Sequence, residues 1–296
     1  MRKGFTLVEI IFVLVIMAVL AAGTFKAIEA IYTRSAQAKA LTELSLQSQI
    51  VLDQLSVLLY NRIPNSVIGY TPGGICEAID ELTVGRPVLE WLAMADDALL
   101  EGEYDGFVDM NGSFYVNAAN NRLLTPGNMM SDSTDLNLVF AGAFDGGAES
   151  VSACSGAFGW HNPSSTLSYA LSFGADKNIT ITDSVKPEFI YEKYYLTHTA
   201  YAVARGADID LTSTCVSSLG VPVDENTLFL FYDYQPYAGE TFCADGGDGN
   251  ASVLAQDVSA FTAEAVNDVI RLSIDMNRNV RGKTCGVHVS KQKAVF

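Results

Sequence analysis

The sequence predicts an α+β protein in which one long amino-terminal helix packs against a head of antiparallel β-sheet. Three observations support this fold class. Residues 5–25 form an uninterrupted apolar run, a helical pattern without proline continues to Asn61, and short β-type runs separated by Gly, Asn, Asp and Ser follow from Ser66 onward. Helical and strand patterns that are segregated along a chain are typical of α+β domains.

Residues 5–25 predict a membrane span. A run of about 21 residues makes roughly 30 Å of helix, which is enough to cross the hydrocarbon core of a bilayer. Glu9 is the only charged residue inside the run. A carboxylate in hydrocarbon costs on the order of 2–3 kcal/mol, so we expect Glu9 to have a partner. Arg2 and Lys3 precede the run, which keeps the amino end in the cytoplasm and exports the rest of the chain.

Residues 26–63 predict an amphipathic stalk that continues the same helix. Apolar residues recur there at helical spacing, with Ser48 filling the one gap: Leu41, Leu44, Val51, Leu55 and Leu58. Pro64 and the glycines that follow it end the pattern. One helix of about 55 residues, roughly 80 Å long, is therefore expected.

Residues 64–296 predict the α+β head, and its length is ample for a buried core. The candidate strands are residues 112–117, 137–144, 167–173, 179–182, 189–204, 227–234 and 269–276. Residues 227–234 carry apolar side chains on nearly both faces, so we expect this strand to lie inside a sheet.

The sequence GFTLVE at residues 4–9, followed by an apolar helix, resembles the signature of type IV prepilins and pseudopilins. The resemblance implies that a prepilin peptidase cuts after Gly4 and methylates the new amino terminus at Phe5. It also implies that Thr6 and Glu9 serve filament assembly, with the Glu9 carboxylate neutralising the amino group of a neighbouring subunit. Two opposite charges attract strongly in a low dielectric, where either one alone is costly.

The same resemblance implies a structural protein rather than an enzyme. Residues 1–4 would be the leader, residues 5–25 the filament-core helix, residues 26–63 the stalk and residues 64–296 a periplasmic pilin-like head. A head of this size resembles the J- or W-type minor subunits, which initiate or cap a type II secretion pseudopilus or a type IV pilus-like filament. The K type is disfavoured because it lacks the glutamate found here at Glu9.

The implied partners are other major and minor pilins or pseudopilins, the prepilin peptidase, the inner-membrane assembly platform and membrane lipid. The implied location is the inner membrane, crossed once with a cytoplasmic amino terminus and a periplasmic head, and afterwards the filament tip. Which of the possible machines the subunit serves stays open at this point.

Charge argues against nucleic acid as a partner. The chain has 18 basic and 34 acidic residues, and loss of Arg2 and Lys3 with the leader leaves a net charge of −18. Broad contact with phosphates needs Lys and Arg, so no nucleic acid binding is expected. The basic residues near the carboxyl end predict a solvated strand and turn: Arg278, Arg281, Lys283, Lys291 and Lys293.

The exported part contains five cysteines, in a compartment that favours disulfides. Cys215 and Cys243 flank the expected central strand, and we predict that they pair. Cys285 could pair with Cys154 or with Cys76. Each bridge should stabilise the fold by roughly 2–4 kcal/mol.

No motif in the sequence requires a cofactor. Asp245, Asp248 and Asn250 place oxygen ligands on a Gly-rich loop and could hold calcium. Their spacing departs from that of an EF-hand, and a solvated acidic turn is the alternative interpretation.

Three other functions remain as alternatives. An ordinary signal peptide would release a secreted binding protein, although Glu9 inside the apolar core disfavours this. A tip adhesin on the same anchor would need an exposed aromatic or cation-loaded groove. An anchored hydrolase would need His161, His198 or His288 to meet a nucleophile and a carboxylate within hydrogen-bond reach.

Overall fold

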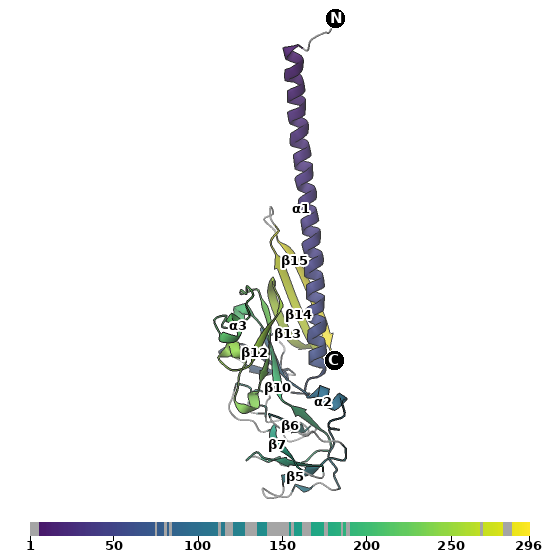
Figure 1. The fold of residues 1–296 in the computed structure, drawn as a ribbon, viewed down its shortest axis with the longest axis vertical. Helices are drawn as coiled ribbons and strands as arrows, with labels where there is room; N and C mark the ends of the chain where they lie inside the picture. The colour runs from purple at the N-terminus through teal and green to yellow at the C-terminus, as the bar shows by residue number, and fades with distance from the viewer. Residues whose placement is uncertain are drawn as a thin grey trace.

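The structure is a computed structural model in which a long helix rises from a β-rich head (Figure 1). The amino terminus lies at the far end of the helix, and the carboxyl terminus lies where the helix meets the head. The residues described are 6–74, 76–79, 82, 85–111, 114–115, 121–127, 135–140, 154, 157–161, 167–174, 177–184, 186–187, 190–266, 269–280 and 286–296. The observed fold class is α+β, as predicted.

Helix α1 spans Leu7–Tyr60 without a break, 54 residues in all. Thr6 caps its amino end, and Asn61 caps its carboxyl end shortly before Pro64. The chain then joins the sheet directly, because the Ile63 N–H donates to the Leu92 carbonyl at 2.9 Å. The predicted length and the stop before Pro64 are both confirmed.

A three-stranded antiparallel sheet lies along the lower half of α1 (Figure 1). Its strands, in spatial order, are β13 (Val258–Val266), β14 (Val269–Arg278) and β15 (Val287–Val295). Alternate β14 side chains, including Leu272 and Ile274, are buried and pack in one cluster with Leu44 and Leu55 of the helix. Period-2 burial facing a helical stripe is how a sheet and a helix share one core.

The buried stripe of α1 differs in part from the predicted one. It consists of Ala40, Leu44, Ser48, Val51, Leu52, Leu55 and Leu59. Leu41 is 49% exposed and Leu58 is partly buried, so these two predicted members do not belong to the stripe. The buried position is shifted by one residue at each end of the stripe. Ala40 is buried in place of Leu41, and Leu59 is buried in place of Leu58.

A six-stranded antiparallel sheet forms the centre of the head, in the order β12-β11-β10-β3-β1-β2. The strand bounds are β1 Ile68–Tyr70, β2 Cys76–Ala78, β3 Val88–Ala93, β10 Thr199–Arg205, β11 Leu228–Tyr234 and β12 Asn250–Ala255. Phe229 and Phe231 of β11 enter the core on one face, whereas Leu228 enters the core shared with α1. Strand β11 is interior and apolar on both faces, as predicted.

A second six-stranded antiparallel sheet lies at the end of the head farthest from the amino terminus (Figure 1). In the order β4-β5-β8-β7-β6-β9, its strands are Phe114–Tyr115, Asn121–Leu124, Asn178–Ile181, Tyr169–Gly174, Asn137–Phe140 and Tyr194–Thr197. It has its own core, with Phe140, Ile179 and Leu196 fully buried. We call it the distal sheet. Its strands all lie between β3 and β10, which are neighbours in the central sheet.

Short helices connect these strands: α2 (Asp96–Leu100), η4 (Gly206–Asp208), α3 (Thr214–Ser217), η5 (Pro236–Ala238) and η6 (Cys243–Asp245). The predicted strand at residues 189–204 is two strands, because the chain leaves β9 in the distal sheet and enters β10 in the central sheet at His198. Parts of the predicted strands at 112–117 and 137–144 lie outside the described residues.

Candidate functional site

A capping box closes the amino end of α1 and fixes the Glu9 carboxylate. Glu9 Oε2 accepts hydrogen bonds from the Thr6 backbone N–H and the Thr6 hydroxyl, each at 3.0 Å. The Glu9 N–H in turn donates to Thr6 Oγ1 at 3.3 Å. Two free donors at a helix start are thereby satisfied reciprocally. Within a single chain, the Glu9 carboxylate thus has Thr6 as a neutral hydrogen-bond partner, and its pairing with the amino group of a neighbouring subunit stays a prediction.

The capping box places a negative charge at the start of the apolar helix, three residues from the peptide that joins Phe5 to Thr6. Gly4 and Phe5, the predicted cleavage and methylation residues, lie outside the described residues. Their roles stay predictions.

The helix beyond the head is exposed and apolar. Among the described residues, one helix, α1, is long and apolar enough to cross a membrane, and its apolar window is entirely unburied. Side chains such as Phe12, Leu14 and Met17 are more than half exposed. An exposed apolar surface of this size marks a membrane or protein contact.

A second exposed apolar stripe lies farther along the stalk. Leu46, Ile50, Val57 and Tyr60 are exposed large apolar side chains. At 100° per residue, the first three lie roughly 140° around the helix from the buried side chains Leu44, Val51 and Leu55. We call them, with Tyr60, the outer stripe. The head covers one face of the stalk and leaves the outer stripe open.

Basic side chains of the three-stranded sheet bind the flank of the stalk. Lys291 Nζ donates to the Ser45 carbonyl at 2.7 Å, and Lys293 Nζ lies 2.6 Å from Asp53 Oδ1. Arg278 contacts Glu43 and Asp257, both at 2.8 Å. The expectation of a solvated basic tail is thus wrong for these three residues, because alternate side chains of β15 turn toward the stalk and Arg278, at the end of β14, pairs with Glu43 and Asp257. Arg281 and Lys283 lie outside the described residues.

These contacts shift the pKa values of their members. The hydrogen bond from Lys293 lowers the pKa of Asp53. The hydrogen bond to Asp257, helped by the one to Glu43, raises the pKa of Arg278. Both shifts favour the charged forms at neutral pH. The stalk is therefore attached to the head by charge as well as by its apolar stripe.

The structure forms two disulfides. Cys215 bonds to Cys243, with a Cα–Cα distance of 6.3 Å, which is the predicted pairing. Cys76 bonds to Cys154, with a Cα–Cα distance of 5.7 Å. The expectation that Cys285 pairs with Cys154 or Cys76 is therefore wrong, since those two residues pair with each other. Cys285 itself lies outside the described residues.

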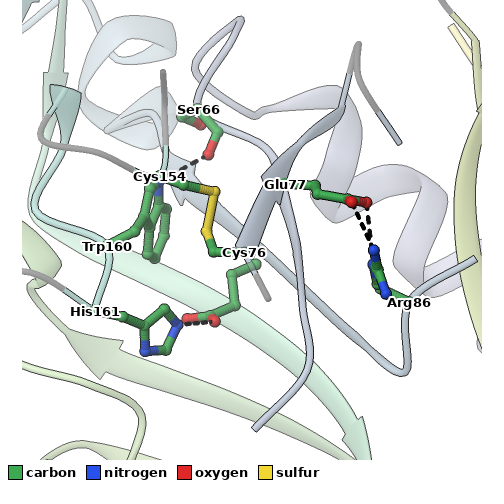
Figure 2. The surroundings of a disulfide bond; sticks show 8 residues. Ser66, Cys76, Glu77, Arg86, Cys154, Trp160 and His161 are labelled. Atoms are coloured by element: carbon green, nitrogen blue, oxygen red, sulfur yellow. Dashed lines mark hydrogen bonds and ion pairs between the residues drawn. A yellow bond between two sulfur atoms is a disulfide. The ribbon is translucent and has the colours of Figure 1, made fainter. Parts of the chain in front are cut away.

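Figure 2 shows the surroundings of the Cys76–Cys154 disulfide. Trp160 and His161 lie on one side of the bridge, and the ion pair between Glu77 and Arg86 lies on the other. The bridge thus joins β2, at the edge of the central sheet, to the segment that carries Trp160 and His161.

The residues predicted to hold calcium point to different partners. Asp245 Oδ2 accepts a hydrogen bond from the Tyr70 hydroxyl at 3.2 Å, and Asn250 Nδ2 donates to Asp233 at 2.9 Å. The Asp248 side chain is exposed. Within the described part of the chain, no group of three or more His, Cys, Asp or Glu side chains is placed to hold a metal ion.

Among the three histidines considered for hydrolysis, His161 is mostly buried, whereas His198 and His288 are exposed. His161 Nε2 lies 2.6 Å from Glu90 and its Nδ1 lies 3.5 Å from Asp245. Its ring stacks on that of Tyr70. These partners are two carboxylates and a phenol, which differs from a triad in which histidine meets a hydroxyl or thiol nucleophile.

Sequence reasoning missed Glu90 and the inward-facing lysines. Glu90 sits in the apolar run of β3, and a lone glutamate in such a run is a signal for a buried ionic partner. In β15, Val and Lys alternate with more exposed residues. This period of two indicates that the Val and Lys side chains share one face of the strand, which is the face that contacts the stalk.

Comparison with known proteins bears on the amino-terminal segment alone. Residues 1–25 match the family described as the prokaryotic N-terminal methylation motif. No curated protein and no solved structure matches the chain. The matched residues include Gly4, Phe5, Thr6 and Glu9 and the first part of the exposed helix.

The matched motif implies processing by a prepilin peptidase and assembly with other pilins. It also fits a membrane-anchored pilin, as does the exposed apolar helix. Together, the motif at residues 1–25, the capped Glu9 and the fold of helix and antiparallel sheets support a type IV prepilin-like protein, the precursor of a pilin-like or pseudopilin subunit.

Proposed function

We propose that the protein is a minor pilin or pseudopilin, a structural and non-enzymatic subunit that initiates or caps a type II secretion pseudopilus or a type IV pilus-like filament. It starts as a single-pass inner-membrane protein with a cytoplasmic amino terminus and a periplasmic head. After cleavage between Gly4 and Phe5, the inner-membrane assembly platform moves it into the filament beside other major and minor subunits. The basic residues Arg2 and Lys3 support this orientation.

The observation that carries the proposal is the exposed apolar half of α1. The cores of the head are closed by α1 residues from Ala40 onward, so residues 7–25 contribute nothing to them. An apolar helix that lies outside every core can be buried in lipid before assembly and against neighbouring helices in the filament. The outer stripe adds a second exposed apolar face between Leu46 and Tyr60 of the same helix.

The capping box supplies the electrostatic part of assembly. Glu9 is held by Thr6 in the single chain, with no cation among its contacts in the described residues. In a filament, its carboxylate turns toward the amino group of Phe5 on a neighbouring subunit. Ion pairing in a low dielectric then compensates the desolvation of both charges.

The distal sheet supports a minor rather than a major role. It is built from chain inserted between two adjacent strands of the central sheet, and it lies at the end of the head farthest from the amino terminus. Such an insertion adds bulk away from the helix and leaves the packing face of α1 unchanged. A subunit at the filament tip has room for that bulk.

The test compares Glu9→Ala with Glu29→Ala, an exposed glutamate of the same helix, in the native host. We expect both variants to insert in the membrane, and only Glu9→Ala to be missing from sheared filaments. The mass of the mature amino-terminal peptide should correspond to Phe5 with one added methyl group, and Gly4→Val should abolish this product. Normal incorporation of Glu9→Ala, or a mature chain that starts near Ala22, would refute the proposal.

A further inference from the structure

A buried ionic cluster at the centre of the head involves Glu90 of β3. Its side chain is 0% exposed. Glu90 Oε1 lies 2.6 Å from His161 Nε2, and Glu90 Oε2 accepts a hydrogen bond from the Tyr234 hydroxyl at 2.8 Å. A buried carboxylate without compensating partners is strongly destabilising, so these two contacts hold Glu90 in place.

The other side of His161 faces a second carboxylate. His161 Nδ1 lies 3.5 Å from Asp245 Oδ2, and Asp245 also accepts a hydrogen bond from Tyr70. The Tyr70 ring stacks on the imidazole, with ring centroids 3.7 Å apart. The titratable groups around His161 are thus Glu90 of β3, Tyr234 of β11, Asp245 of η6 and Tyr70 of β1.

This arrangement suits the charged imidazolium. A neutral imidazole has one N–H, so one of the two carboxylates would face a nitrogen lone pair. The imidazolium carries an N–H on each nitrogen and can donate toward both Glu90 and Asp245. The stacked Tyr70 ring also favours a cation beside its face.

The pKa shifts agree with this geometry. Burial by itself would lower the pKa of His161, but the hydrogen bond to Glu90 and the charges of Glu90 and Asp245 outweigh burial and raise it. Burial also raises the pKa of Tyr234 well above its ordinary value, which keeps its hydroxyl protonated as a donor to Glu90. Burial raises the pKa of Asp245, which works against its charged form, whereas the charge of His161 acts in the opposite direction and lowers it.

The cluster joins two loops to the central sheet. Residues 157–161 place Trp160 in the core, where its Nε1–H donates to the Ser66 carbonyl at 3.1 Å. The Cys76–Cys154 disulfide ties the chain leading to this segment to β2 (Figure 2). Asp245 belongs to η6, which the Cys215–Cys243 disulfide ties to α3. His161 is the contact between the two loops.

We propose that Glu90, His161 and Asp245 form a proton-dependent latch that holds residues 157–161 and η6 against the central sheet of the head. The latch is closed when His161 is protonated. On deprotonation, Asp245 or Glu90 loses its donor, and the loop at residues 157–161 detaches more easily from the sheet.

The sign of the pH dependence follows from the raised folded-state pKa of His161. The stabilisation is fully present below the unfolded pKa of about 6.5 and is lost as the pH rises through the folded value. If the pKa of His161 differs by one unit between the closed and the open latch, protonation of His161 changes the ratio of closed to open latch about tenfold.

The first experiment measures unfolding midpoints of the oxidised full-length chain in detergent from about pH 5 to about pH 9, a range that brackets the ordinary histidine pKa. His161→Gln keeps a hydrogen-bonding side chain without the titratable charge, and His198→Gln is the matched exposed control. We expect the midpoint difference between wild type and His161→Gln to shrink as pH rises, and His198→Gln to follow wild type. A difference that does not change with pH overturns the latch.

A second measurement is needed because His161→Gln removes a buried partner and can prevent folding. Histidine ring resonances of the full-length chain are titrated in wild type, His198→Gln and His288→Gln. The two exposed histidines are assigned by their loss, and the remaining resonance belongs to His161. We expect His161 to titrate above the ordinary histidine pKa of about 6.5. A His161 titration at or below about 6.5 refutes the proposal, whatever the stability data show.

Discussion

Truncation of Leu55 tests whether the stalk and the three-stranded sheet share one core. Leu55 is 0% exposed and belongs to the cluster that also contains Leu272 and Trp91. Leu55→Ala removes three carbons there, and a large-to-small change in a closed core costs about 2 to 5 kcal/mol of unfolding free energy. Urea titration of the full-length chain in detergent measures the loss, and tryptophan fluorescence reports it from inside the same cluster through Trp91.

The matched control is Leu46→Ala, the same substitution on the outer stripe of the same helix. Leu46 is 63% exposed, so its truncation should change the unfolding free energy by no more than about 0.5 kcal/mol. For filament incorporation we expect the reverse order. Leu46→Ala should lower the amount of subunit found in filaments more than Leu55→Ala does. Equal stability losses for the two variants would refute the assignment of the two faces of α1.

Two further predictions concern the head. Replacing the cysteines of the Cys76–Cys154 bridge with alanine should destabilise the oxidised chain more than the same change at Cys215–Cys243, since the sequence separations are 78 and 28 residues. Loop entropy gives about 4.5 against about 3.6 kcal/mol, which urea titration can compare, and a reversed order would contradict it. Gly159→Ala should cost more than Gly220→Ala. Both glycines have positive φ, for which alanine costs about 1–2 kcal/mol. Of these two glycines, Gly159 is the one at which a Cβ would also lie 2.2 Å from the Pro236 carbonyl oxygen. Equal thermal midpoints for the two variants would contradict the prediction and show that the loop around Gly159 can move to relieve the clash.

The features predictable from the sequence were those with strong local signals. Helix α1 has a capping threonine, a long run without proline and then Pro64, and both ends follow from these residues. Strand β11 has apolar residues at consecutive positions, which only a strand covered on both faces can bury. The Cys215–Cys243 pair flanks that strand, so its proximity follows from the strand itself.

The features that could not be predicted depend on contacts between distant residues. Glu90 and His161 are separated by 71 positions, and neither residue alone indicates the other. The chain switches sheets at His198 inside a continuous β-type run, so periodicity shows one strand where there are two. The order of strands in the central sheet brings β3 beside β10, and this topology has no local signature.

The contact between strand β15 and the stalk, which was not predicted, shows how the surroundings of one element depend on another. The inward positions of β15 include Lys291 and Lys293, which break an apolar alternation and therefore suggest a solvated segment. Their alkyl chains pack against the stalk while their ammonium groups reach Ser45 and Asp53 on its polar flank.

The same geometry explains why the outer stripe stays open. The sheet covers the buried stripe, and its lysines contact Ser45 and Asp53, while the side chains of the outer stripe remain exposed. The outer stripe lies on the same helix as the apolar half of α1 near the amino terminus, separated from it by the polar stretch that carries the Lys39–Glu43 ion pair. A monomer in the membrane can bury the amino-terminal half in lipid, whereas the outer stripe lies beyond the span and needs protein. The apolar span is therefore buried in lipid before assembly and by neighbouring helices afterwards. The outer stripe, in contrast, is first buried when subunits pack together.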